Sequence, residues 1–468
     1  MRSIYTTGSI GGLLSLVMAV VALGVGGPTR ATQPRKPNIV FILADDLGYG
    51  DIGPYGQREI LTPNLDRLAA QGLRFTQAYA GAAVCAPSRS VLMTGLHTGH
   101  TPVRANAGTI PLQDGDVTLA ETLQQAGYRT GGFGKWGLGD AGSEGAPTRQ
   151  GFDEFFGYLH QIHAHSYYPE FLWHNGRKQP LPRNANGGRG EYSADLIAER
   201  ALRFIRAHRD RPFFLYAAFT LPHGRFQVPD DEPYGDRDWP QAEKNFASMV
   251  TRLDGHIGRI VALLEELKLD RDTIVFFTSD NGGVSADGHD VARFRSNGPF
   301  RGEKGSLYEG GIRVPMIVRW PGRVAANASS DVPWGLWDVL PTAAALAGAR
   351  PPAGLDGVSM LPAILGEKAA GPDQRSPEFL YWEHQQFDRQ KSALRANAMI
   401  QAVRMGDWKA VRPRPGAPLE LYDLARDVGE RRDVSGAHPD VVARIESYLE
   451  TARTAPRPHD TGSFEFKR

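Results

Sequence analysis

Two continuous apolar runs of strand length, at 38–44 and 273–278, dominate the hydrophobic pattern of the chain. Runs that are apolar at nearly every position are typical of strands buried on both faces of a parallel sheet. An amphipathic stretch from about 244 to 269 precedes the second run and predicts a helix. Shorter strand-like runs lie at 128–133 and 213–219. These elements predict an α/β fold with a large, mostly parallel sheet flanked by helices.

The pattern changes at about 370–376, where Gly, Pro and Asp interrupt it and mark a domain boundary. Beyond this point, 398–411 and 419–424 predict the strands of a hairpin, and 439–454 predicts a helix. We therefore expect a smaller C-terminal subdomain that combines an antiparallel sheet with a helix. The tail from Ala455 is expected to be frayed.

Residues 1–31 have the organisation of a secretory signal peptide. Arg2 supplies a positive charge, 10–27 form an apolar core, and Thr29-Arg30-Ala31 offers a cleavage site. The apolar core is close to the length that spans a bilayer, so a retained membrane anchor is the alternative. No cysteine lies near Ala31, which excludes a lipoprotein. We predict an exported protein, periplasmic or extracellular, with no stable membrane span once the signal is cleaved.

Composition is that of an ordinary globular protein, with 41% hydrophobic and 22% charged residues in 468. The formal net charge is only +1, so no global field attracts nucleic acid, and any selectivity for anions must be local to a site. The 54 glycines and 33 prolines indicate many loops, which suits an enzyme whose pocket is built from connections between strands.

Acidic and amide side chains follow both long apolar runs. Asp45 and Asp46 come directly after the first run, and Asp280 and Asn281 follow the second. In open α/β sheets, ligands bind at the carboxyl ends of the strands, so these four side chains can converge there. Three carboxylates and an amide suit Ca²⁺, or Mg²⁺ with its stricter geometry. The alternative for a single Asp-Asp pair is a helix cap or a solvated turn.

The only cysteine of the chain, Cys85, lies at the start of a predicted helix, with Arg89 one turn further on. A helix N-terminus and a fixed cation favour a bound anion. Two other interpretations stay open at this point: Cys85 is a small buried apolar residue, or its thiol is the nucleophile of a hydrolase. It has no second cysteine with which to pair.

The segment around this cysteine, with Cys85, Pro87, Ser88 and Arg89 followed by Leu-Met-Thr-Gly at 92–95, resembles the signature of the type I sulfatases, members of the alkaline phosphatase superfamily. The resemblance implies that a formylglycine-generating enzyme converts the cysteine to formylglycine, whose hydrate attacks the sulfur of a sulfate ester. It also implies that calcium is bound by the formylglycine oxygen and by four further side chains. These are Asp45, Asp46, Asp280 and Asn281. A thiol would be too soft a ligand for that ion.

Three further segments resemble sulfatase sequences. Lys135, in Gly134-Lys135-Trp136, and Lys304, within 301–315, match the two lysines that contact the sulfate, together with Arg89 and calcium. His223, after the apolar run at 213–219, matches the histidine that protonates the leaving group. A nucleotide-binding P-loop around Lys135 is excluded, because Trp follows the lysine where Ser or Thr is needed.

One position departs from the family pattern. Many sulfatases carry a histidine two residues after the first lysine, where it helps to deprotonate the formylglycine hydroxyl, but this chain has Gly137. His97 and His100 follow the cysteine signature and are candidates to replace that base, and His100 is the one we favour.

A histidine-rich segment lies at 158–168, with His160, His163 and His165 among aromatic residues. The residue types allow a zinc site, but the spacing matches no common structural zinc motif. Aromatic rings beside histidines suit the face and hydroxyls of a sugar. We therefore expect a pocket loop near the substrate, with His165 and His100 as candidate substrate contacts.

The resemblance extends from about 36 to 362 and continues more weakly beyond. It implies an alkaline phosphatase-like catalytic domain at 36–372, followed by a small subdomain at 376–468. The predicted activity is hydrolysis of a sulfated small molecule or glycan outside the cytoplasm. The alternatives are a phosphonate monoester hydrolase or phosphodiesterase with the same nucleophile, and a non-catalytic binder of sulfated glycan that lost turnover with Gly137.

Overall fold

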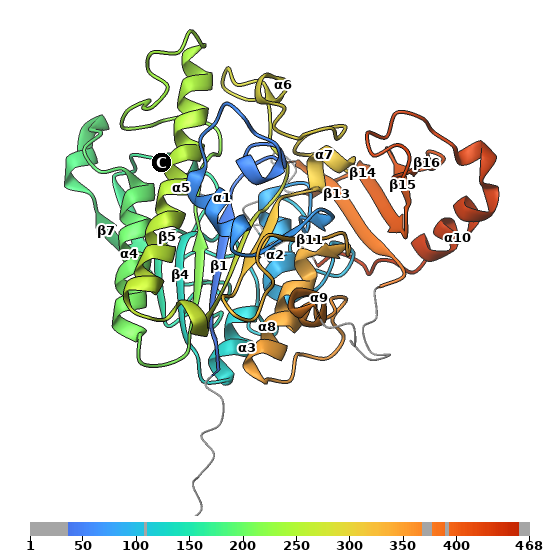
Figure 1. Ribbon diagram of the computed structural model, residues 1–468. Helices are drawn as coiled ribbons and strands as arrows, with labels where there is room; N and C mark the ends of the chain where they lie inside the picture. The colour runs from blue at the N-terminus through green and yellow to red at the C-terminus, as the bar shows by residue number, and fades with distance from the viewer. Residues whose placement is uncertain (1–35, 107–109, 367–376, 389–392, 458–468) are drawn as a thin grey trace, which may run out of the picture. The chain divides into compact units, whose positions relative to one another are not determined.

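The computed structural model describes residues 36–106, 110–366, 377–388 and 393–457 (Figure 1). The predicted signal peptide and the predicted domain boundary at 370–376 lie outside these residues. Within them, no helix combines the length and apolar character that crossing a bilayer requires.

The centre of the fold is a ten-stranded sheet, in the order β11-β2-β10-β9-β1-β8-β4-β5-β6-β7. The five strands from β9 to β5 run parallel, and antiparallel pairings of β10 with β9 and of β6 with β5 flank them. The prediction of a large, mostly parallel sheet is confirmed. Its strands are β1 (Asn38–Ala44), β2 (Leu73–Phe75), β4 (Arg129–Lys135), β5 (Glu154–Tyr158), β6 (Phe171–His174), β7 (Arg177–Pro180), β8 (Phe213–Ala218), β9 (Thr273–Ser279), β10 (Met316–Arg319) and β11 (Ala328–Ser330). A two-stranded sheet pairs β3 (Ala78–Tyr79) with β12 (Trp334–Gly335).

Helices cover both faces of the sheet, and β1 shows why its sequence is apolar throughout. Because side chains alternate along a strand, residues 39, 41 and 43 belong to one core and residues 40, 42 and 44 to the other. The first core is shared with α2 (Cys85–Thr94), α3 (Leu119–Gln125) and α8 (Val339–Ala347). The second is shared with α1 (Pro63–Ala70), α4 (Ser193–His208) and α5 (Gln241–Glu266).

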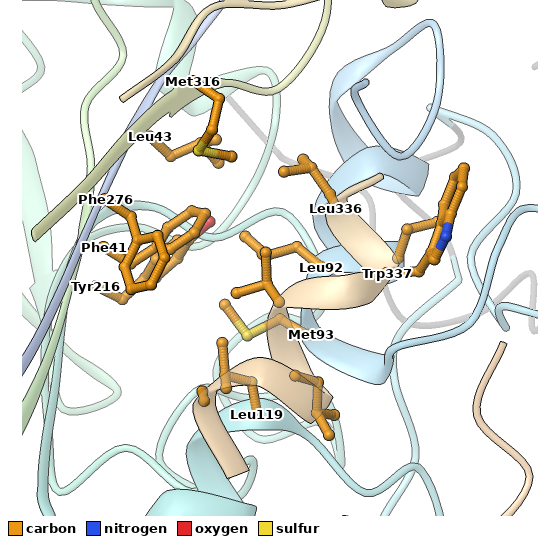
Figure 2. Packing of buried hydrophobic residues seen from close by; sticks show 14 of the residues in the cluster. Phe41, Leu43, Leu92, Met93, Leu119, Tyr216, Phe276, Met316, Leu336 and Trp337 are labelled. Atoms are coloured by element: carbon orange, nitrogen blue, oxygen red, sulfur yellow. The ribbon is translucent and has the colours of Figure 1, made fainter. Parts of the chain in front are cut away.

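Helix α2 is buried at every residue. Figure 2 shows Leu92 and Met93 of this helix within the first core, between the aromatic rings of the sheet and Leu336 and Trp337. Phe41 of β1 stacks on Phe276 of β9, with 5.9 Å between the ring centroids. A helix held on all sides fixes the position of its first residue, Cys85.

The small C-terminal sheet is antiparallel, in the order β13-β14-β15-β16 (Figure 1, orange to red). Its elements are β13 (Leu380–Asp388), β14 (Ala393–Met405), β15 (Trp408–Arg412), β16 (Glu420–Asp423) and the helix α10 (Pro439–Leu449). The prediction of one strand over 398–411 is wrong, because the chain turns at Gly406, whose φ is 60°, and forms two strands there. The frayed tail is also wrong at its start, since Arg457 donates to Asp116 at 2.6 and 2.7 Å.

A buried group of charges, the Lys409 cluster, joins the small sheet to the segment that follows Lys304. Lys409 Nζ on β15 lies 2.8 Å from Glu309 Oε1 and 3.0 Å from Glu430 Oε1. Arg313 donates to the other oxygen of Glu309 at 3.0 Å. The side chains of Lys409, Glu309 and Glu430 are fully buried.

Candidate functional site

The carboxyl ends of β1 and β9 bring the predicted metal ligands together. These neighbouring strands are in register to their last residues, where Ala44 pairs with Ser279. Asp46 N donates to Asp280 Oδ1 at 3.2 Å, and Asn281 Nδ2 donates to Asp46 Oδ1 at 2.8 Å. Asp46 has a φ of 63°, a left-handed conformation that is uncommon outside glycine and occurs often at functional sites.

The two predicted lysines reach the same point. Lys135 is the last residue of β4 and is fully buried, with its Nζ 2.7 Å from Asp45 Oδ2. Lys304 Nζ lies 2.6 and 2.7 Å from the oxygens of Asp46 and 3.3 Å from Cys85 Sγ. Residues about 170 positions apart therefore place two ammonium groups beside the single cysteine.

Cys85 is buried and surrounded by charge. Its Sγ lies 3.4 Å from Asp45 Oδ1 and 3.9 Å from Asp46 Oδ1. Burial raises the pKa of the Cys85 thiol to about 12, although Lys135 and Lys304 act in the opposite direction. The thiol is therefore protonated at neutral pH and is a poor nucleophile.

Arg89 lies within this cluster rather than at its opening. Its Nε and Nη2 donate to Asp280 Oδ2 at 3.1 and 2.7 Å, and its Nη1 donates to the Lys135 carbonyl at 2.7 Å. The side chain is completely buried. This arrangement differs from the expectation that Arg89 would contact the sulfate, because its donors are used to hold Asp280 and the end of β4.

The three carboxyl groups differ in their pKa values. Burial alone would raise the pKa of Asp45, but Lys135, followed by His223 and Arg89, holds it well below its usual range. Burial acts in the same way on Asp46, whose pKa Lys304 lowers. Burial, and then the charge of Asp45, raises the pKa of Asp280 to about 7 despite Arg89.

The donor set fits a hard divalent cation. Asn281 Oδ1 is buried and has no hydrogen-bond partner, so one amide oxygen is left for a ligand. Asp45, Asp46, Cys85 and His223 offer ligand atoms within 4.8 Å of one another, and Asp280 and Asn281 both contact Asp46. Carboxylate and amide oxygens bind Ca²⁺ or Mg²⁺. The three carboxylates are balanced by Lys135, Lys304 and Arg89. A bound divalent ion would therefore leave a net positive charge, which suits an anionic substrate.

His223 and His165 lie together at this site. His223 Nε2 is 3.5 Å from Asp46 Oδ2, and its Nδ1 is 3.3 Å from the Gly224 carbonyl. The ring of His165 stacks on that of His223, with 4.5 Å between centroids. Burial lowers the pKa of both histidines, that of His165 to about 3. The His165 ring is therefore neutral at neutral pH.

The other two histidines of the histidine-rich segment have packing roles. The ring of His163 lies 5.0 Å from that of Tyr158 and 4.6 Å from that of Phe171. His160 Nδ1 accepts from the Ile162 amide at 3.1 Å. Within the described residues, the three histidines of this segment do not form a group of metal ligands, so the geometry does not support a zinc site.

His100 lies away from Cys85. It follows the C-terminal end of α2, whereas Cys85 is at the N-terminal end, about 15 Å away at 1.5 Å per residue. His100 Nδ1 is 2.9 Å from Asp356 Oδ1, and its ring stacks on His97 at 4.4 Å. The geometry therefore gives no support to His100 as the replacement base or as a substrate contact.

These two histidines and Asp356 form a second group whose donor atoms could hold a metal ion. His97 Nδ1, however, accepts a hydrogen bond from the Gly99 amide at 3.1 Å. The proton of neutral His97 is then on Nε2, which lies 3.5 Å from Asp356 Oδ1. A nitrogen that carries a proton is not a metal ligand, so this group is better explained as a structural contact.

Gln161 fills the space of the missing histidine. A side chain at Gly137, where φ is 80°, would overlap the Gln161 amide. Gln161 is buried, and its Nε2 has no hydrogen-bond partner. No local pattern points to Gln161, because its contact with Gly137 depends on pairing beyond β4 and β5. There, Gly137 N donates to the Leu159 carbonyl at 3.0 Å.

Comparison with known sequences identifies relatives along most of the chain. A family model described as Sulfatase matches residues 37–349, and one described as N-sulphoglucosamine sulphohydrolase, C-terminal, matches residues 301–455. The chain is 35% identical to human arylsulfatase A, over 88% of this chain and 87% of that protein. It is 31% identical to N-acetylgalactosamine-6-O-sulfatase of Bacteroides thetaiotaomicron, over 90% and 94% of the two chains.

Solved structures give a similar result. Ps i-CgsB in complex with k-i-k-neocarrahexaose matches with a TM-score of 0.78 and 29% identity, over 91% of this chain and 96% of that one. The phosphonate monoester hydrolase of Agrobacterium radiobacter matches with a TM-score of 0.67 and 23% identity, over 89% and 95% of the two chains. At that identity the second match shows a shared fold only.

Proposed function

Since the chain belongs to the sulfatase family, we propose that it is an exported enzyme that hydrolyses sulfate esters on a glycan. The observation that carries this proposal is the position of Cys85, whose Sγ lies between the two metal-binding carboxylates and Lys304. The Bacteroides relative is named for N-acetylgalactosamine and the Ps i-CgsB structure holds k-i-k-neocarrahexaose, which supports a glycan as the substrate class.

An oxygen at position 85 accounts for the surroundings better than a thiol does. A thiolate would be repelled by Asp45 and Asp46, and the raised pKa of Cys85 already disfavours it. We propose that Cys85 is converted to formylglycine by a formylglycine-generating enzyme. The hydrate of this aldehyde supplies a hard oxygen, both as a nucleophile and as a ligand for calcium.

The side chains of the site have separate tasks in this proposal. Lys304 contacts Cys85 directly and Lys135 contacts Asp45, which itself contacts Cys85, and the two lysines bind the sulfate oxygens. Such preorganised cations stabilise the charge of the transition state in a site from which water is excluded. Arg89 holds Asp280 and the end of β4 in place.

His223 is the proposed general acid for the leaving oxygen. A carbonyl oxygen only accepts hydrogen bonds, so the Gly224 carbonyl binds the Nδ1 proton of His223. Nε2 is then the nitrogen that faces the reacting group, 3.5 Å from Asp46. Burial lowers the pKa of His223, and the carboxylates of Asp46 and Asp45 partly offset this by favouring the protonated ring. His165 supports this ring by stacking on it.

Ca²⁺ is the proposed cofactor, with Mg²⁺ as the alternative, held by Asp45, Asp46, Asp280 and Asn281. When bound, the ion polarises the sulfate and offsets the charge of the carboxylates.

We also propose that 1–31 are a cleaved export signal, that 36–372 form the catalytic domain, and that 376–468 form the small subdomain. The second family model begins at 301, so it covers both sides of this boundary.

The test is sulfate release by protein that has been co-expressed with a formylglycine-generating enzyme. We expect release of inorganic sulfate from an aryl sulfate and from at least one member of a panel of sulfated glycans. Peptide mass spectrometry should show that the Cys85 side chain has become an aldehyde. An active preparation in which Cys85 is entirely unmodified would refute the mechanism.

An aryl phosphodiester and an aryl phosphonate monoester, assayed in parallel, separate the related activities. Faster turnover of either than of the aryl sulfate would favour the phosphonate hydrolase alternative. Binding of sulfated glycan without turnover of any ester would favour the non-catalytic alternative.

A further inference from the structure

A hollow of about 540 Å³ lies beside the proposed catalytic site. Its size is within the range of roughly 300–1,000 Å³ that is usual for ligand pockets. The side chains that matter for its chemistry are Arg295, Phe300, Glu303 and Ser285. None of them has a task in the proposed reaction.

One wall of this hollow is locked to the segment that follows Asp46. Gly50 N donates to the Ser296 carbonyl at 2.6 Å. A Cβ at Gly48 would overlap the Ser296 carbonyl, and a Cβ at Gly50 would overlap the Arg295 carbonyl, so the two backbones touch. Arg295 is therefore held at a fixed position, in contact with a loop that begins two residues after Asp46.

The opposite wall leads to Lys304. Glu303 lines the hollow and directly precedes this lysine. The Lys304 amide donates to the Gly283 carbonyl at 3.1 Å, and Asn297 Oδ1 accepts from the Gly283 amide at 2.8 Å. Asn297, which also lines the hollow, thus ties it to the loop that carries the metal-binding amide. The hollow borders the site from both sides.

The guanidinium of Arg295 lines this hollow and has no partner among the described residues. It is exposed, it follows the short helix α6 (Val291–Phe294) with a φ of 54°, and its guanidinium forms no ion pair or hydrogen bond with any described residue. It also lines a second hollow of about 290 Å³, which continues to Arg58. The Arg58 guanidinium is likewise exposed and forms no hydrogen bond or close ion pair with the described side chains, although Asp66 lies near enough to feel its charge. Arg293, which also lines the second hollow, is neutralised by Glu59 at 2.8 and 2.9 Å.

We propose that the two hollows form one trough, which binds the acidic sugar units next to the scissile sulfate of a polyanionic glycan. This inference rests on the proposed function. Arg295 would bind the first neighbouring anionic group and Arg58 the next, since a guanidinium pairs with sulfate or carboxylate through two parallel hydrogen bonds. Phe300 offers an apolar ring face to a sugar, and it is fixed by Tyr49 at 4.8 Å between ring centroids.

The test uses polyanions as inhibitors of aryl sulfate hydrolysis, so that the natural substrate need not be known. Dextran sulfate probes sulfate groups, polygalacturonate probes carboxylates, and dextran is the neutral control. Arg295→Ala and Arg58→Ala should each weaken inhibition by about fivefold to tenfold, and the double variant by more. Turnover of the small aryl sulfate should stay within about twofold of wild type. Because the contacts are exposed, inhibition of wild type should weaken with salt.

Arg350→Ala is the matched control, since Arg350 is exposed and follows α8, outside the residues that line the trough. Arg295→Lys keeps the charge and should retain part of the effect. Equal inhibition of wild type and the double variant by both polyanions would refute the proposal that the trough binds the glycan.

If wild type fails to hydrolyse the aryl sulfate, the proposed function is wrong instead. Direct titration of each variant with dextran sulfate still tests whether the trough binds polyanions. Loss of inhibition by only one of the polyanions would identify the acidic group that it accepts.

Discussion

The cluster at the ends of β1, β4 and β9 and the Lys409 cluster are both buried groups of opposite charges. In the Lys409 cluster, every carboxylate oxygen lies within 3.0 Å of a cationic or amide nitrogen, although Glu430 Oε1 is held by an ion pair alone and forms no hydrogen bond. Glu309 Oε1 and Glu430 Oε1 face Lys409, Glu309 Oε2 accepts from Arg313, and Glu430 Oε2 accepts from the Glu309 amide at 2.6 Å. In the strand-end cluster, Asn281 Oδ1 has neither a hydrogen bond nor an ion pair, and the Cys85 thiol, a weak donor, lies 3.4 Å from Asp45 Oδ1.

This difference indicates that the Lys409 cluster has a structural role and that the strand-end cluster has a role in the reaction. A buried ion pair contributes little net stability, but breaking one leaves an uncompensated charge that costs several kcal/mol. The charges of the Lys409 cluster balance one another and join the small sheet to the segment that follows Lys304, so loss of Lys409 should destabilise the fold. The strand-end cluster is incomplete without a ligand, so its loss should stop the reaction first.

The largest expected effect is that of Cys85→Ala. Removing a nucleophile costs on the order of 10⁶-fold in kcat in a well-studied hydrolase, and we expect sulfate release to fall by at least about 10⁴-fold. The melting temperature should stay close to that of wild type, because only one small buried side chain is shortened. Measurable binding of sulfated substrate to this variant is the control. Retained turnover would place the nucleophile elsewhere.

Lys409→Met tests the other cluster. It leaves Glu309 and Glu430 buried side by side without their shared cation, so the free energy of unfolding should fall by about 3–5 kcal/mol. Urea denaturation measures this change. The fraction that remains folded should keep kcat near the wild-type value, since Lys409 does not contact the strand-end cluster. Unchanged stability would contradict the distinction between the two clusters.

Lys135→Ala and Lys304→Ala should each lower kcat by about 10²–10³-fold, the usual loss when one preorganised group that stabilises the transition state is removed. Lys268→Ala is the control, because Lys268 is exposed and lies at the end of α5. A rise in KM with unchanged kcat would mean that the lysines bind the ground state and the transition state equally. The two lysines would then be binding groups rather than catalytic ones.

Sequence patterns predicted the strand-end cluster because its parts are local. Each metal-binding pair directly follows an apolar strand, and parallel strands deliver their ends to one edge. Cys85 and Lys304 could be placed because each lies in a segment of distinctive sequence that resembles one family. The shape of the sheet follows from the same runs, as β1 and β9 began and ended within one residue of the predicted limits.

The remainder depends on contacts between distant residues that carry no local pattern. Glu309, Lys409 and Glu430 meet only because the small sheet packs against the segment after Lys304. The strand β13 was not predicted, and the turn at Gly406 was missed, because an apolar run of this length fits one strand or two. Gln161 could not be connected to Gly137 without the pairing of the loops that follow β4 and β5.

Gly137→His, which restores the residue common in the family, should therefore harm this protein. The backbone at position 137 has a φ of 80°, which a histidine adopts only with strain, and the new side chain would overlap the Gln161 amide. Overpacking of this kind costs about 1–3 kcal/mol, and kcat should not rise. Gly137→His combined with Gln161→Ala should recover part of the lost stability in urea denaturation. A single variant that is both stable and faster than wild type would show that Gln161 moves aside.

The smallest effect is the pH dependence of calcium binding, and it again distinguishes the clusters. In the metal-free protein, burial and Asp45 raise the pKa of Asp280 to about 7, whereas Lys409 and Arg313 outweigh burial and lower the pKa of Glu309 to about 2. Calcium requires ionised Asp280, so its affinity should fall by about tenfold for each pH unit below 7, or about 1.4 kcal/mol.

The raised pKa of Asp280 also determines whether the metal-free protein gains or loses stability as the pH rises. A carboxyl whose pKa is raised in the folded state stabilises the metal-free fold below its unfolded pKa, and this contribution is lost as pH rises through 7. Chelated protein should therefore be less stable at pH 8 than at pH 6, and calcium should raise the melting temperature more at pH 8. Calorimetric titration measures the calcium affinity at both pH values, and thermal melts measure the stability. Asp280→Asn is the control, because its side chain does not titrate. An affinity that is equal at pH 6 and pH 8 in wild type would mean that Asp280 is already ionised throughout, and that Arg89 rather than burial controls it.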